Sequence, residues 1–87
     1  MSLDDSGRRR PLSRAEITEN ARRVEALVAP YVGTSLIDFD QSIRPLGCEV
    51  RVVVEDGRGI GVFMDYHGRR VNVVVARGIV TEIQSIG

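Results

Sequence analysis

Apolar residues in the first half of the chain recur at helical spacing and predict two helices. Ser13 and Glu16 form a capping box, and Pro30 stops the helix that follows. A second box, Ser35 with Asp38, begins a shorter helix that Pro45 and Gly47 end. Core-facing positions in the first helix are Ile17, Ala21, Val24, Leu27 and Val28, and in the second Leu36, Phe39, Ile43 and Leu46.

The second half alternates valine with polar residues and predicts three strands, over residues 49–55, 69–76 and 79–86. In the middle strand, Val71, Val73 and Val75 share one face, while Asn72 and Val74 share the other. Arg77-Gly78 predicts a tight turn. We therefore expect an α+β fold, a small helix-on-sheet domain over residues 13–87 with a long exposed loop between strands one and two. We expect residues 1–12 to be a flexible, arginine-bearing tail.

Composition argues against catalysis. The chain has 87 residues, one cysteine and one histidine, and 43% of its residues are hydrophobic. The single Cys48 permits no intrachain disulfide and is expected to be buried. His67 has no nucleophile pattern beside it, and no phosphate-loop motif follows the glycines near residue 59. We expect no enzyme activity, no metal and no cofactor.

Charge is balanced overall but unevenly placed. Arginines 8, 9, 10 and 14 lie in the first fourteen residues, and from Ala15 onward eight arginines face ten acidic residues. So short a basic run argues against nucleic acid as a partner. No apolar run has the ~18 residues of a membrane span, and no signal peptide is visible in this chain. We expect a soluble protein with no membrane association; the compartment stays open, with the cytoplasm favoured.

The loop over residues 57–70 is the most informative segment. A compact domain rarely keeps so long a connection unless the loop is functional or disordered. Met64 is followed directly by Asp65, and arginines stand at the entry to the next strand. Met64 suits a large apolar specificity pocket, and the carboxylate of Asp65 can accept a forked bond from Arg70. These parts suit a preorganised bait loop for a protease.

The segments Val62-Phe63-Met64-Asp65-Tyr66, Arg70-Val71-Asn72-Val73 and Ile79-Val80-Thr81-Glu82-Ile83 resemble the potato inhibitor I family. They are closest to its bacterial branch of small serine protease inhibitors. The resemblance covers about residues 32–87 and leaves an extra N-terminal helix before it. It implies inhibition of a subtilisin- or chymotrypsin-like serine protease, with Met64–Asp65 as the scissile-type bond. By the same resemblance, the reactive loop comprises Val62, Phe63, Met64, Asp65, Tyr66 and His67, and the loop is supported by Arg70 and Asn72.

Two other functions remain open. The first is a non-inhibitory interaction or oligomerisation module on an inhibitor-like fold, with a homodimer among the forms it could take. It is favoured by Gly57, Gly59 and Gly61, by the extra helix, and by His67, where the family often has arginine. The second is a nucleic-acid accessory domain acting through the arginine tail. The mildly acidic folded part, without interleaved aromatic residues, argues against it.

Overall fold

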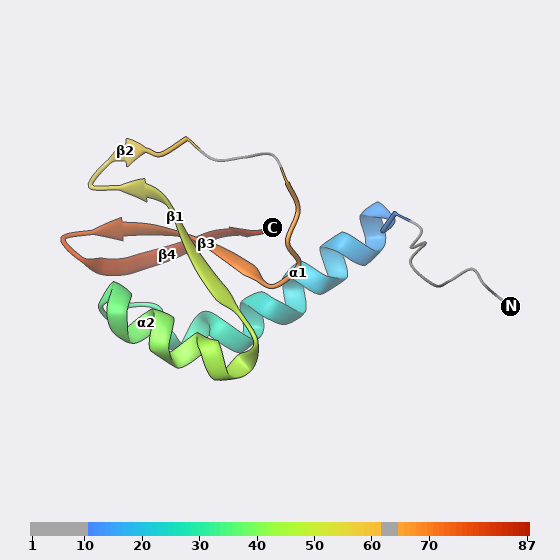
Figure 1. Ribbon diagram of the computed structural model, residues 1–87, viewed down its shortest axis with the longest axis horizontal. Coiled ribbons are helices and arrows are strands. Elements are labelled where there is room, and N and C mark those ends of the chain that lie inside the picture. Colours follow the sequence, from blue (N-terminus) through green and yellow to red (C-terminus); the bar gives the residue numbers. More distant parts are fainter. Residues whose placement is uncertain (1–10, 62–64) are drawn as a thin grey trace, which may run out of the picture.

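The computed structural model describes residues 11–61 and 65–87 as two helices on one side of a four-stranded sheet (Figure 1). This arrangement confirms the predicted α+β fold. The elements, in chain order, are α1 (Arg14–Val28), the short 3₁₀ helix η1 (Ala29–Tyr31), α2 (Leu36–Ile43), the 3₁₀ helix η2 (Arg44–Leu46), β1 (Glu49–Glu55), β2 (Arg58–Gly59), β3 (Arg70–Ala76) and β4 (Ile79–Ile86).

Both helices begin where their caps predict. Ser13 accepts a hydrogen bond from the Glu16 amide at 3.1 Å, and the Glu16 side chain accepts one from the Ser13 amide at 2.8 Å. Ser35 likewise accepts from the amide of Asp38 at 3.1 Å. These bonds satisfy amides that have no partner inside the helix. At the end of η2, which follows α2 directly, Gly47 has φ of 80°, a left-handed conformation that glycine adopts without steric cost.

The sheet order, β2-β1-β3-β4, gives the long loop a geometric cause. β1 and β3 are parallel, whereas β1 with β2 and β3 with β4 are antiparallel. A parallel pair needs a crossover of a dozen or more residues, because the chain must return to the end at which the first strand began. The connection from Asp56 to Arg69 is this crossover, so its length follows from the topology.

The short strand β2 was not predicted. Asp56 and Gly57 have φ of 50° and 84°, and the next residues turn back along β1. Arg77 and Gly78, with φ of 52° and 78°, form the same kind of two-residue turn between β3 and β4. The two turns are bonded together, since Asp56 Oδ1 accepts from the amide of Arg77 at 2.8 Å. The Asp-Gly dipeptide is a strong hairpin signal that would have located β2.

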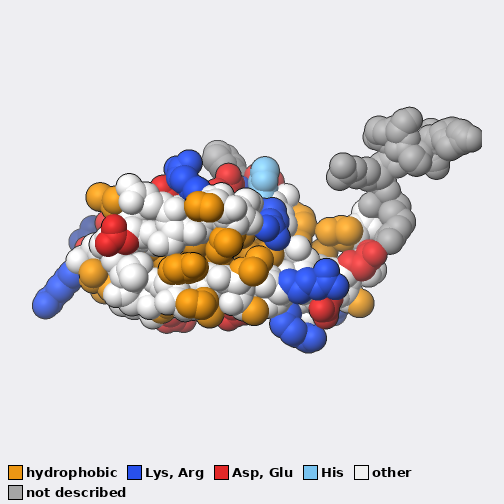
Figure 2. Space-filling view, turned by 90° about the horizontal axis from the view of Figure 1, so that it is seen from below, with side chains coloured by type: hydrophobic (Ala, Val, Ile, Leu, Met, Phe, Trp, Pro, Cys, Tyr) orange, Lys and Arg blue, Asp and Glu red, His pale blue; other side chains and the backbone are white. Residues whose placement is uncertain are grey.

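The core lies between the helices and the sheet. Its buried residues come from α1, α2, β3, β4 and the position just before β1, and are Val24, Val28, Phe39, Ile43, Cys48, Val71, Val73, Val75 and Val80. Cys48 is buried, as predicted. By contrast, Ile17 and Leu27 of the predicted apolar stripe are 36% and 43% exposed. On the helix-covered side, hydrophobic side chains gather along the middle of the surface, with arginines toward its ends (Figure 2).

Two further features concern the described residues alone. Neither α1 nor α2 has the length and apolar character required to cross a bilayer. Within residues 11–61 and 65–87, no group of three or more His, Cys, Asp or Glu side chains is arranged to hold a metal ion.

Candidate functional site

The predicted reactive loop is described only on its C-terminal side. Val62, Phe63 and Met64 lie outside the described residues. Residues 65–69, called here the exit segment, lead from that point into β3. Asp65, Tyr66 and His67 are exposed, and the Arg70 amide donates to the His67 carbonyl at 3.0 Å, which closes a turn at the base of the segment.

Arg70 is the principal contact of Asp65. Its side chain is 11% exposed, and its Nη2 donates to the main-chain carbonyl of Asp65 at 2.9 Å and to carboxylate Oδ1 at 3.1 Å. The predicted contact is present, but the predicted fork onto the carboxylate is wrong. Arg70 Nε instead donates to the carbonyl of Gly87 at 3.1 Å, so it is not available for the second carboxylate oxygen. The arrangement fixes the backbone of Asp65 as well as its side chain.

A second arginine, Arg51, reaches the same site from β1. Its Nη2 donates to the carbonyl of Gly87 at 3.2 Å, and its Nη1 lies 3.9 Å from Asp65 Oδ1. Sequence reasoning missed Arg51. The available signal was its position between Val50 and Val52, which places it on the sheet face away from the helices.

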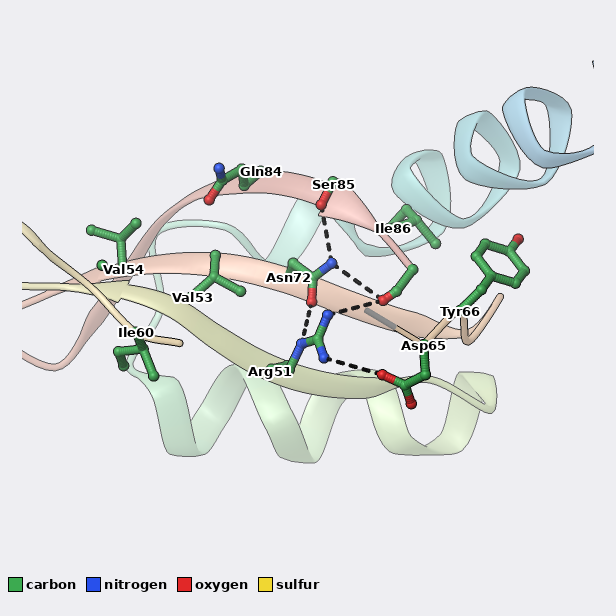
Figure 3. A pocket seen from close by; sticks show the side chains of 12 residues that line it. Arg51, Val53, Val54, Ile60, Asp65, Tyr66, Asn72, Gln84, Ser85 and Ile86 are labelled. Carbon is green, nitrogen blue, oxygen red and sulfur yellow. Dashed lines mark hydrogen bonds and ion pairs between the residues drawn. The ribbon is translucent and has the colours of Figure 1, made fainter. Parts of the chain in front are cut away.

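Asn72 connects the two sides of this site without touching Asp65. Its Oδ1 accepts from Arg51 Nε at 2.9 Å, while its Nδ2 donates to Ser85 Oγ at 3.0 Å and to the Gly87 carbonyl at 3.4 Å (Figure 3). Asn72 is 5% exposed. Its position thus agrees with a supporting role that passes through Arg51 and Gly87. We call Arg51, Arg70, Asn72 and the Gly87 carbonyl the support cluster.

The charges around Asp65 favour its ionised form. The hydrogen bond from Arg70 holds the pKa of the Asp65 carboxyl below its ordinary value of 3.8, and the charges of Arg70 and His67 act in the same direction. His67 Nε2 lies 3.4 Å from Asp65 Oδ2, the carboxylate oxygen other than the one that Arg70 contacts. Both side chains are about half exposed, so solvent weakens the attraction between them.

Tyr66 ties the exit segment to the rest of the protein. Its hydroxyl accepts from Asn20 Nδ2 of α1 at 3.1 Å, and the same nitrogen donates to the Gly68 carbonyl at 2.8 Å. The Tyr66 ring lies against Gly87, where an added Cβ would come within 3.3 Å of Cδ1. Sequence reasoning named Tyr66 as a loop residue but gave no sign of Asn20, which is distant in the sequence.

A hollow of about 520 Å³ lies between the exit segment and the sheet face that the helices leave uncovered. Apolar side chains of Val53, Val54, Ile60 and Ile86 line it beside polar groups of the support cluster. Those polar groups are already bonded to one another, as Figure 3 shows. The hollow therefore suits the support of the loop better than the capture of a polar ligand.

No protein-family model, curated protein or solved structure matches this chain.

Proposed function

We propose that this protein is an inhibitor of a subtilisin- or chymotrypsin-like serine protease, which it engages with Met64 in the specificity pocket. The observation that supports the proposal is the pair of hydrogen bonds from Arg70 to the carbonyl and the carboxylate of Asp65. Asp65 follows the proposed scissile bond directly and would supply the leaving amine. The support cluster therefore acts on the leaving-group side of that bond.

This hold explains how a substrate-like loop resists turnover. Attack by the protease serine on the Met64 carbonyl would release the amine of Asp65. Because Arg70 keeps Asp65 in place, the amine stays near the acyl carbon and rejoins it faster than water hydrolyses the acyl enzyme. A loop ordered before binding also avoids the entropy cost of becoming ordered in the complex.

The test is a titration of subtilisin and of chymotrypsin with the wild-type chain and with Met64→Gly. The matched control is Leu12→Gly, which removes a large apolar side chain that is 48% exposed and lies outside the helices. Wild type and Leu12→Gly should inhibit stoichiometrically at micromolar concentration, and Met64→Gly should not. Full protease activity with wild type would reject the proposal, as would equal inhibition by Met64→Gly.

A second candidate, a non-inhibitory interaction module that forms a homodimer, is favoured by exposed apolar residues. Ile37 of α2 is 69% exposed, and Leu27 and Ile79 are 43% and 38% exposed. Light scattering of wild type and Ile37→Asp separates the candidates. A dimer that Ile37→Asp dissociates, together with absent inhibition, would favour the module; a monomer with inhibition would favour the inhibitor.

A further inference from the structure

The two halves of α1 have different surroundings. Val24 and Val28, in its C-terminal half, are fully buried in the core, whereas Ile17, in its N-terminal half, is 36% exposed. In Figure 1 this N-terminal half extends past the end of the sheet, beside the exit segment. Asn20 stands between the two halves, where the helix passes from the core to the loop.

Asn20 makes two contacts with the exit segment through one nitrogen. Its Nδ2 donates to the Gly68 carbonyl at 2.8 Å and to the Tyr66 hydroxyl at 3.1 Å. An amide NH₂ carries two N–H donors, so both donors of Asn20 are bonded to acceptors in the exit segment. Both contacts leave α1, since their partners are more than forty residues away in the sequence.

The contact is closely packed. A Cβ added at Gly68 would lie 3.2 Å from Asn20 Nδ2 and 3.3 Å from the Tyr66 hydroxyl, so the absence of a side chain lets the three groups meet. From Tyr66 the contacts continue to Gly87, whose carbonyl accepts from Arg70 Nε at 3.1 Å. A continuous series of contacts therefore joins Asn20 to Asp65 through Tyr66, Gly87 and Arg70.

We propose that Asn20 is a positioning residue and that α1 braces the exit segment of the reactive loop. The claim that α1 holds the exit segment in place rests on the contacts alone. The claim that this affects inhibition rests on the proposed function. Asn20 acts on the same leaving side of the Met64–Asp65 bond as Arg70, from an element outside the resemblance to known inhibitors. Loss of the brace increases local opening of the exit segment while the core stays folded.

The structural side is tested by amide hydrogen exchange in Asn20→Ala, with Thr18→Ala as the control at an exposed position of the same helix. The Arg70 amide, bonded to the His67 carbonyl, reports local opening, and amides at the centre of β3 report global unfolding. Asn20→Ala should speed exchange at Arg70 by about three- to tenfold relative to Thr18→Ala, the effect of losing one or two hydrogen bonds. Exchange in β3 should match in the two variants.

The predicted effect on cleavage by the protease is tested by mass spectrometry of subtilisin complexes of the same two variants. Asn20→Ala should be cut at Met64–Asp65 several-fold faster than Thr18→Ala, while the two have equal melting temperatures. A merely structural role would change the melting temperature and leave the cleavage ratio at one.

Tyr66→Phe, which removes one contact of Asn20 and keeps the ring on Gly87, should shift exchange at Arg70 in the same direction and serves if Asn20→Ala fails to fold.

The outcomes separate this inference from the proposed function. Unchanged exchange at Arg70 in both Asn20→Ala and Tyr66→Phe would overturn the brace, even if wild type inhibits. Faster exchange at Arg70 without inhibition by wild type would support the brace and reject the inhibitor. Faster exchange with an unchanged cleavage rate would overturn the claim that Asn20 positions the scissile side of the loop.

Discussion

Arg70 Nη2 donates to both the carbonyl and the carboxylate of Asp65, at 2.9 and 3.1 Å. The contact spans five residues of the chain and closes the exit segment onto the first residue of β3. Because Arg70 is nearly buried and bonded in turn to Gly87, it is held in place before any partner arrives. The segment next to the proposed scissile bond is therefore ordered by the fold itself.

Arg70→Met should weaken both stability and inhibition. Methionine keeps the apolar stem but removes three hydrogen bonds, so we expect the free energy of unfolding to fall by about 1–3 kcal/mol. Arg22→Met is the matched control, because the Arg22 side chain is 72% exposed; we expect it to change stability by less than about 0.5 kcal/mol. Urea unfolding measures the change in the free energy of unfolding for each variant. Equal effects in the two variants would contradict the role given to Arg70.

The lowered pKa of Asp65 predicts a stability contribution that depends on pH. Because the folded pKa lies below the ordinary value of 3.8, the contribution is complete above that value and is lost as pH falls through the folded pKa. The free energy of unfolding of wild type should therefore exceed that of Asp65→Asn by more at pH 7 than at pH 2. Urea titrations across this range measure the difference. In an Arg70→Met background the pH dependence should largely disappear; its persistence would assign the shift to another group.

The hydrophobic pattern was sufficient to predict the fold class because burial in this small domain follows local periodicity. The valines of β3 and the caps at Ser13 and Ser35 lie where the pattern places them. What periodicity does not encode is which strands pair. The parallel pairing of β1 with β3 depends on long-range contacts, and it set the length of the loop.

The site was predicted in part for the same reason. Asp65 and Arg70 are close in the sequence, so their contact could be inferred from spacing. Arg51, Gly87 and Asn20 join the site only through the folded sheet and the docked helix. No local pattern marks these residues, because their partners lie 17 to 48 positions away.

Arg51 and Asn72 should be energetically coupled. Their 2.9 Å hydrogen bond and shared acceptor, Gly87, form one network in which each side chain orients the other. In a double-mutant cycle of Arg51→Met and Asn72→Ala, we expect a coupling energy of about 0.5–3 kcal/mol in thermal or urea unfolding. Additive effects would mean that the two residues support the site independently.

Gly78→Ala should destabilise the β3–β4 turn. Gly78 has φ of 78°, which costs alanine about 1 kcal/mol or more. Gly59→Ala is the matched control, because no atom lies within 4 Å of its added Cβ and its φ is ordinary. The denaturant midpoint of Gly78→Ala should be lower than that of wild type, and the midpoint of Gly59→Ala should not. Equal midpoints would show that the turn tolerates a side chain.

The most direct test of the central claim is mass spectrometry of a subtilisin mixture, taken over time while residual protease activity is followed. We expect stoichiometric loss of protease activity while most of the chain stays intact, with slow cleavage confined to Met64–Asp65. Rapid cleavage anywhere in residues 57–70, with the protease fully active, would contradict it: the support cluster would then hold Asp65 without making the loop an inhibitor.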